Sequence, residues 1–81
     1  MPNSDVVPLA SLGAGRTGFV AGFRLPDDVR NRLLELGLVA GTAVRIERFA
    51  PLGDPVEIAF RGSHLTLRRH EADQILVQPA A

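Results

Sequence analysis

Hydrophobic residues in this chain recur at two different spacings, and the change of spacing divides the chain into elements. Val29, Leu33 and Leu36 follow one another at helical intervals, with charged residues on the remaining faces, which predicts an amphipathic helix over residues 26–36. Gly37 comes directly after this run and can adopt the positive φ with which many helices end. The pattern therefore predicts one substantial helix with a glycine at its exit.

From Gly41 onward hydrophobic and polar residues alternate, which is the pattern of strands with one buried face. Residues 50–55, Ala-Pro-Leu-Gly-Asp-Pro, interrupt the alternation and predict a stiff loop between two strands. Gly62-Ser63 predicts a two-residue hairpin turn of type II′, in which glycine comes first. The positions predicted to face inward are Val44, Ile46, Val56, Ile58, Phe60, Leu65 and Leu67.

The segment before the helix mixes glycines with hydrophobic residues. Residues 16–24 hold β-branched and aromatic residues among glycines, which predicts a strand with tight bends. Residues 9–15 predict a turn anchored by leucines. Val6 and Val7 predict a short strand or an extended lead-in that Pro8 interrupts.

The C-terminal segment returns to short elements. Residues 70–74, His-Glu-Ala-Asp-Gln, suit a single helical turn. Ile75 and Val77 alternate with Leu76 and predict a last short strand, because alternate residues of a strand share one face. Residues 78–81 are then expected to form a tail.

These elements predict a mainly β fold with about five strands, one inserted α-helix and a short C-terminal helical turn. Closing the strands into a small barrel removes exposed sheet edges, which favours a barrel over two packed sheets. A three-stranded sheet with the helix on one face is the alternative. The 81 residues are expected to form a single domain, since a chain of this length builds only one small core.

The composition excludes several classes of function but does not assign one. The chain is 46% hydrophobic and has a formal net charge of zero, with nine basic residues, all arginine, against nine acidic ones. A nucleic-acid module is usually basic, so no nucleic-acid partner is expected. Cysteine is absent, which excludes thiolate metal sites and disulfides. No signal peptide or membrane-spanning run is visible, so we expect a soluble cytoplasmic protein without membrane insertion.

Candidate catalytic and metal-ligating residues are few. His64 and His70, with Glu71 and Asp73, could form a mixed nitrogen and oxygen site, but their spacing lacks the arrangement that preorganises metal ligands. Solvated histidines are therefore expected, with no metal site and no cofactor. Asp54 is expected to accept a backbone N–H within its turn, because no acid or base partner is evident. The chain is not expected to be an enzyme.

Leu52 and a group of arginines are candidates for recognition. Leu52 lies in the stiff loop, where it is either an exposed anchor for a partner or a plug beneath the barrel end. Arg61, Arg68 and Arg69 form a mild basic cluster that Arg48 could join. Outward-facing acids at positions 47 and 57 are expected to neutralise that cluster across strands.

Three stretches together resemble the FeoA family, ferrous iron transport protein A. They are LLELGLVAG at residues 33–41, APLGDP at 50–55 and RGSHLTLRRHEADQILV at 61–77. The match is ordered and spans about residues 9–77, which the resemblance implies is the domain core. It implies a small SH3-like barrel with a helical insertion, a cytosolic location, and action with FeoB, the membrane ferrous iron transporter that carries a GTP-binding domain. The same domain type resembles the C-terminal module of metal-dependent transcriptional repressors.

The resemblance implies a non-enzymatic accessory protein of bacterial ferrous iron uptake, docking on the cytosolic side of a FeoB-type transporter. The expected contact residues are Pro51, Leu52 and Asp54 of the loop, followed by Arg32 and Glu35 on the exposed helix face. A metal-responsive or nucleic-acid-linked regulatory module is the alternative, motivated by the two histidines and the arginines. A self-assembling structural module is a third possibility.

Overall fold

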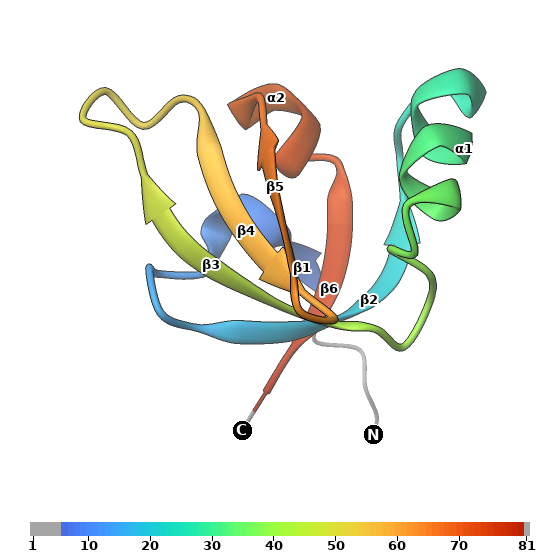
Figure 1. Ribbon diagram of the computed structural model, residues 1–81, viewed down its shortest axis with the longest axis horizontal. Coiled ribbons are helices and arrows are strands. Elements are labelled where there is room, and N and C mark those ends of the chain that lie inside the picture. The colour runs from blue at the N-terminus through green and yellow to red at the C-terminus, as the bar shows by residue number, and fades with distance from the viewer. Residues whose placement is uncertain (1–5, 81) are drawn as a thin grey trace.

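The computed structural model describes residues 6–80, in which six antiparallel strands form one strongly curved sheet (Figure 1). The strand order is β1-β6-β2-β3-β4-β5. The elements in chain order are β1 (Val7–Pro8), the 3-10 turn η1 (Leu9–Ser11), β2 (Thr17–Phe23), α1 (Asp27–Glu35), β3 (Ala43–Phe49), β4 (Val56–Phe60), β5 (Ser63–Leu67), α2 (Arg69–Ala72) and β6 (Ile75–Pro79). The mainly β prediction with one inserted helix is confirmed, with one strand more than expected.

The additional strand and a longer last strand correct the prediction at both ends of the described chain. Pro8 does not interrupt the first strand but pairs with Leu76 of β6, which is possible because β1 is an edge strand and needs no N–H there. Residues 78–80 are not a tail. Gln78 pairs with β2, and the N–H of Ala80 donates to the carbonyl of Thr17 at 2.9 Å. Ala81 lies outside the described residues.

Strand β2 bends through the barrel and pairs with two neighbours. Its first part pairs with β3, and its register with β6 shifts between Val20 and Gly22. Gly18 lies so close to β6 that a Cβ there would meet Val77 Cγ2 at 2.9 Å, closer than non-bonded carbons pack. The predicted strand with tight bends is thus confirmed, and Gly18 is needed for close packing.

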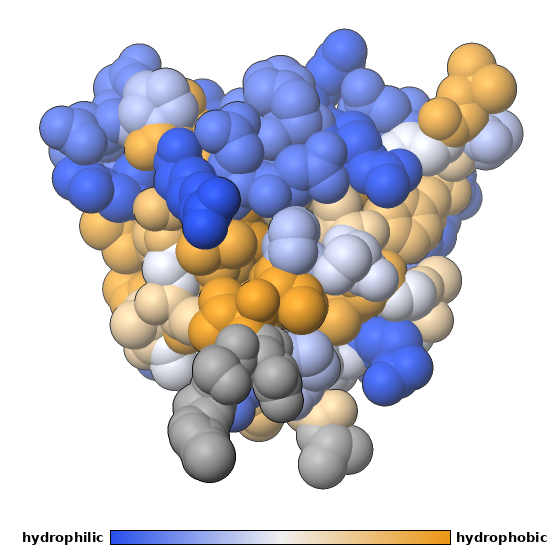
Figure 2. Space-filling view, turned by 180° about the vertical axis from the view of Figure 1, so that it is seen from behind, coloured by the Kyte–Doolittle hydropathy of each residue, from blue (hydrophilic) through white to orange (hydrophobic). Residues whose placement is uncertain are grey.

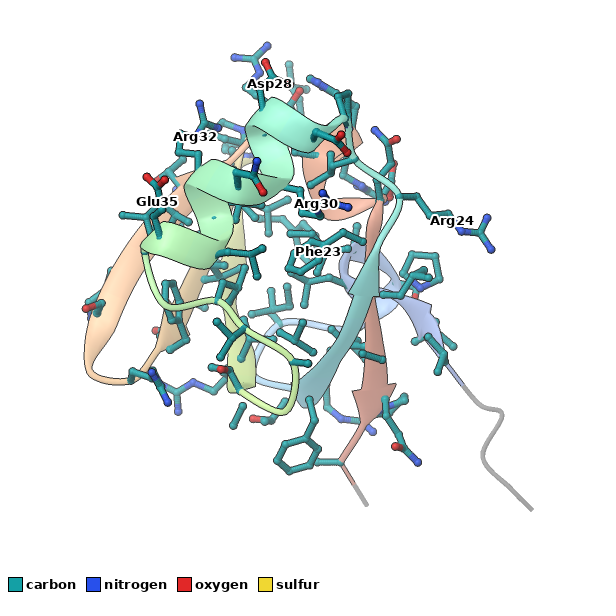
Figure 3. All side chains as sticks on the ribbon, turned by 90° about the vertical axis from the view of Figure 1, so that its right-hand side faces the viewer. Phe23, Arg24, Asp28, Arg30, Arg32 and Glu35 are labelled. Carbon is teal, nitrogen blue, oxygen red and sulfur yellow. The ribbon has the colours of Figure 1, made fainter. Side chains whose placement is uncertain are left out.

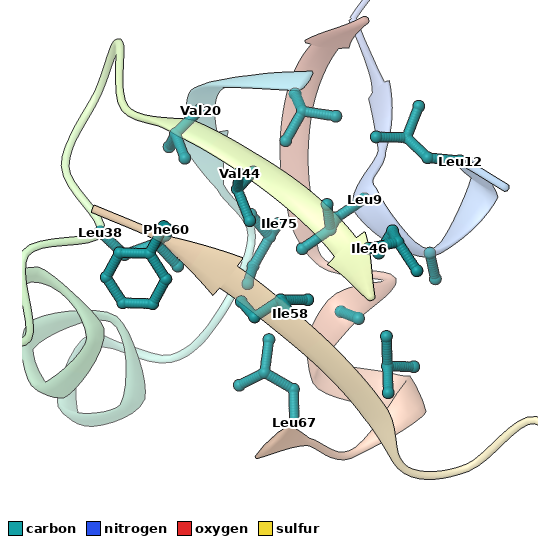
Figure 4. Close-up of a cluster of buried hydrophobic side chains, with 14 of the residues drawn as sticks. Leu9, Leu12, Val20, Leu38, Val44, Ile46, Ile58, Phe60, Leu67 and Ile75 are labelled. Atoms are coloured by element: carbon teal, nitrogen blue, oxygen red, sulfur yellow. The ribbon is translucent and has the colours of Figure 1, made fainter. Parts of the chain in front are cut away.

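The core lies inside the curved sheet and follows the predicted alternation (Figure 4). Val44, Ile46 and Ile58 are fully buried, and so is Val56, as expected for strands with one inward face. Leu65 is only partly buried against the cluster. The other buried hydrophobic residues are Leu9, Ala10, Leu12, Val20, Leu25, Leu33, Leu38, Phe60, Leu67, Ala72, Ile75 and Val77.

The helix α1 packs on the core through a narrower stripe than predicted. Leu33 is fully buried and Val29 packs partly against the core. Leu36 is 53% exposed, so its predicted place in the stripe is wrong. The helix ends at Glu35, and Leu36 therefore follows the chain as it turns away from the core.

The exit of α1 brings a different leucine into the core. Gly37 has a φ of 101°, and its N–H donates to the carbonyl of Leu34 at 3.0 Å. The N–H of Leu38 donates to the carbonyl of Leu33 at 3.0 Å, which completes a Schellman motif. The fully buried Leu38 thus occupies core space beside the last helical turn (Figure 4), and the predicted glycine exit is confirmed.

The inserted segment that carries α1 is bonded to the sheet at both of its ends. The N–H of Arg24 donates to the carbonyl of Gln74 at 2.7 Å, just before the insertion begins. The N–H of Gly41 donates to the carbonyl of Val20 at 2.8 Å, just after α1 and its exit. Thr42 then accepts the N–H of Val20 at 2.9 Å. These bonds fix where the insertion leaves and rejoins the barrel.

The turn between β4 and β5 lies one residue earlier than predicted. Phe60 pairs with Ser63, so the two turn residues are Arg61 and Gly62, with φ values of 54° and 77°. Two successive positive φ values are the signature of a type I′ turn rather than type II′. Burial sets the register between β4 and β5, because this register turns Phe60 and Leu67 toward the core.

Candidate functional site

The β3–β4 loop, residues 50–55, projects from one end of the barrel (Figure 1). Leu52 at its tip is 95% exposed, so the plug interpretation is wrong, and its role as an anchor for a partner stays a prediction. From behind, this end is largely hydrophilic, with a hydrophobic group standing out on the side of the loop (Figure 2). A single apolar side chain is therefore presented above a polar surface.

Asp54 attaches this loop to the helix α2. Its Oδ1 accepts the backbone N–H of Arg69 at 3.0 Å and lies 3.8 Å from Arg68 Nε. The carboxylate therefore accepts a backbone N–H, as predicted, but that N–H belongs to a residue 15 positions away rather than to its own turn. Asp54 thus holds the loop in place, and its predicted partner contact stays a prediction.

The side chain of Arg69 contacts the β3–β4 loop and the end of β3. Its guanidinium lies 5.5 Å from the centre of the Phe49 ring, and its Nη1 donates to the carbonyl of Gly53 at 3.5 Å. Nε lies 3.7 Å from Asp73 Oδ1 within α2. Gly53 has a φ of +85°, and a Cβ there would lie 3.0 Å from the same guanidinium. The glycine therefore provides both the backbone conformation and the space for this contact.

The exposed face of α1 is connected to the same end through α2. Arg32 Nη2 lies 3.6 Å from Glu71 Oε2, and Glu71 Oε1 also accepts the N–H of Arg68 at 3.2 Å. Arg32 and Glu35 extend from the outer side of α1 (Figure 3), and both are exposed. We call the β3–β4 loop, α2 and this outer face of α1 the polar end.

The polar end connects the two candidate patches only through α2, which lies between the β3–β4 loop and α1 (Figure 1). The ion pairs that connect them are largely exposed, with Arg32 at 60% and Arg68 at 68% side-chain exposure. Such pairs typically contribute less than about 1 kcal/mol each. They therefore add little to stability, and the bond from the Arg69 N–H to Asp54 is the one that attaches the loop to α2.

The histidines lie on separate elements. His64 is on β5, His70 is in α2, and both are exposed. Across residues 6–80, no three side chains among His, Cys, Asp and Glu lie close enough to hold a metal ion together. In the same residues, no helix has the length and apolar character needed to cross a bilayer.

The predicted arginine cluster is divided between the two ends of the barrel. Arg48 pairs with Glu57 at 3.3 Å across β3 and β4, as expected, whereas Arg61 lies in the β4–β5 turn away from the polar end. Glu47 pairs with Arg45 instead of the cluster. The sequence analysis missed Asp54 and Asp73 as partners of α2, although the spacing of Arg69 and Asp73 is a signal for a helical ion pair.

Residues 7–79 match the model of the FeoA domain. The solution structure of a FeoA protein from Chlorobium tepidum is 44% identical, covers 93% of this chain and 71% of its own, and superposes with a TM-score of 0.89. The FeoA of Stenotrophomonas maltophilia, solved with zinc, is 28% identical over 86% of this chain and 87% of its own, with a TM-score of 0.75. It is described as an SH3 domain protein and a candidate ferrous iron transport activating factor.

A manganese-dependent transcriptional repressor shares the fold. Its TM-score is 0.85 at 17% identity, with 99% of this chain aligned to 45% of the repressor. At that level of identity the likeness concerns the arrangement of strands and helices alone, and fold does not by itself carry function.

Proposed function

Because this chain belongs to the FeoA family, with an SH3-like barrel, we propose that it is a non-enzymatic cytoplasmic accessory protein of ferrous iron uptake. Its task in this proposal is to dock onto the cytosolic part of a FeoB-type membrane transporter. The observation that supports docking most directly is the fixed, 95% exposed Leu52 above an otherwise polar end.

We place the main contact at Leu52 and Pro51 of the β3–β4 loop. An apolar side chain held on a braced loop loses little conformational entropy on binding, so most of its buried area contributes to affinity. Arg32 and Glu35 are the second contact region, suited to polar contacts at the rim of such an interface. Asp54 contributes by fixing the loop through its bond to the N–H of Arg69.

The proposal is tested by measuring binding of the purified chain to the GTP-binding domain of the transporter and to the full transporter, with and without nucleotide. Binding to either supports the accessory role, and a dependence on nucleotide makes the role regulatory. Clean absence of binding to both, in all nucleotide states, rejects it.

The contact surface is tested with two matched substitutions. Leu52→Gln is expected to weaken binding at least about tenfold if Leu52 fills an apolar pocket of the partner. Phe19→Gln makes a comparable change at another exposed hydrophobic residue, on β2, and is expected to leave binding within about twofold because β2 is not part of the polar end. Equal effects of the two would reject the loop as the docking surface.

A metal-responsive regulatory module is the second candidate. The observation in its favour is the zinc complex of the Stenotrophomonas maltophilia FeoA. Calorimetric titration with ferrous, manganous and zinc ions separates the two candidates. Stoichiometric binding that His64→Gln or His70→Gln removes would favour the regulatory module, and heat changes no larger than those of dilution would remove it.

A further inference from the structure

A groove of about 370 Å³ lies on the outer face of the sheet, at the end where β4 turns into β5. In Figure 1 this turn is at the opposite end of β4 from the β3–β4 loop. β4 has five residues, so the two ends are about 16 Å apart at the usual rise per strand residue. The groove is therefore separate from the polar end.

The strand register explains why a hollow forms here. Thr17 faces Arg45, Arg45 faces Ala59, and Ala59 faces His64 across four neighbouring strands. Facing residues of one row point to the same side of the sheet. The methyl group of Ala59 thus lies between two long side chains, which form walls, and Ala43 widens the floor on β3.

The groove is lined by cations without a lining acid. Its charged or titratable side chains are Arg45, Arg61 and His64. Arg45 is already engaged, since its Nε donates to Glu47 Oε2 at 2.9 Å. Arg61 makes no ion pair with any of residues 6–80. One guanidinium of the groove lining therefore has no acidic partner among residues 6–80.

The backbone at Arg61 is a second unusual feature. Its φ of 54° is the only positive value among the non-glycine residues of the described chain. Asparagine, aspartate or glycine normally occupies this position of a type I′ turn, because the positive φ brings the Cβ of most other residues too close to the backbone. Residues held in such conformations are concentrated at binding sites, which points to a use for this arginine beyond forming the turn.

Arg61 also lies beside the exit of α1, where its Nη1 is 3.8 Å from the position a Cβ would take at Gly37. The last carbonyls of a helix carry partial negative charge, so a structural role at this exit is the alternative to ligand binding for this cation. Any test of ligand binding must therefore distinguish the two roles of the side chain.

We propose that this groove binds the carboxylate of an acidic peptide segment on a partner protein, with Arg61 as the main contact and His64 as the second. Guanidinium groups bind carboxylates through charge-assisted hydrogen bonds. A single unengaged guanidinium suits a singly charged carboxylate, whereas a phosphate dianion usually requires several donors or a cluster of backbone N–H groups. With one contact at the polar end and one at the groove, the chain would bind two partner surfaces at once.

The probe is a blocked tetraglutamate peptide added to the intact chain at low salt while backbone amide shifts are followed by NMR. We expect saturable shifts at Ala59, Gly62 and His64, weakened by added sodium chloride because the contact is electrostatic. A blocked tetraglutamine peptide should give no such shifts. Inorganic phosphate is the third titrant. If it shifts the same amides at lower concentration than tetraglutamate, the carboxylate assignment is overturned.

Arg61→Gly removes the cation while glycine keeps the positive φ of the turn. This variant is expected to bind tetraglutamate about tenfold more weakly, which is the loss typical of one hydrogen bond to a charged group. Arg24→Gln is the matched control, because Arg24 is exposed, makes no ion pair with the described residues and extends away from the groove (Figure 3). It should bind as the parent does.

His64→Gln provides an independent variant on the β5 side of the groove, with an expected loss of about threefold from one weaker polar contact. The proposal is overturned if Arg61→Gly lowers the melting temperature but leaves the affinity for tetraglutamate unchanged, since Arg61 would then serve only the exit of α1. Equal losses in Arg61→Gly and Arg24→Gln would likewise reject it, because they would report net charge rather than a site.

Discussion

The two connections of β4 are stabilised in opposite ways. The β3–β4 loop is held by side chains from a distant helix, with Asp54 and Gly53 bonded to Arg69. The β4–β5 turn is held by its own backbone, with positive φ at Arg61 and Gly62 and direct pairing of the strands. A long projecting loop can thus be held by tertiary contacts, where a tight turn is held by local ones.

The largest expected effect comes from the strand that both connections share. Ile58→Ala empties fully buried space in the middle of β4 and is expected to lower the free energy of unfolding by about 3 kcal/mol. Urea denaturation measures this value, and Glu57→Ala on the outer face of the same strand is the control, expected within about 1 kcal/mol. A loss below about 1 kcal/mol in Ile58→Ala would contradict the assigned core.

The next largest effect is expected from the tertiary bond that holds the β3–β4 loop, which has no counterpart in the β4–β5 turn. Asp54→Ala removes the acceptor of the Arg69 N–H and is expected to cost about 1 kcal/mol, as for the loss of a helix cap. Hydrogen exchange at the Arg69 amide should accelerate, because the bond that protects it is absent. Asp73→Ala removes only an exposed ion pair of Arg69 and should cost less than about 0.5 kcal/mol. An unchanged exchange rate of the Arg69 amide in Asp54→Ala would show that contacts other than this hydrogen bond hold the loop.

The corresponding change in the turn is expected to be small and of opposite sign. Arg61→Gly relieves a positive φ at a long side chain but gives the unfolded chain more freedom, so unfolding should change by less than about 1 kcal/mol, in the stabilising direction. Thermal unfolding followed by circular dichroism measures it. A clear destabilisation would mean that Arg61 supports α1 through the contact near Gly37.

The smallest effect is expected at the loop tip. Leu52→Ser should alter the free energy of unfolding by less than about 0.5 kcal/mol, because a 95% exposed side chain has few contacts to lose. Chemical denaturation of the two proteins side by side is sufficient. Stability lost here would show that the loop tip packs on the polar end, whereas stability retained leaves Leu52 free for a partner.

The parts of the fold that could be predicted are those governed by local period. Ile46, Ile58 and Leu67 were placed correctly because alternation in a strand decides which face is buried. The turn register was wrong by one residue, since a glycine suits more than one turn type and long-range pairing decides among them. Leu36 was misplaced because the helix pattern does not reveal that the chain leaves the helix one residue earlier.

The candidate site was predictable in pieces but not as a surface. A stiff loop was predicted from Pro51 and Pro55, and exposure of Leu52 was one of two expected outcomes. The bond from Asp54 to Arg69 spans 15 residues, and no local pattern specifies which N–H a turn carboxylate will accept. The assembly of loop, α2 and α1 into the polar end therefore required the tertiary structure.

The hydrogen bonds at Arg24 and Gly41 have a consequence for how this barrel can diversify. They close the sheet on either side of the inserted segment, so these backbone bonds do not involve the residues of the helix between them. A helix of another length or charge could be exchanged there, as long as the new segment fills the core positions of Leu25, Leu33 and Leu38. The insertion is thus a natural position for changing partner preference while the scaffold is preserved.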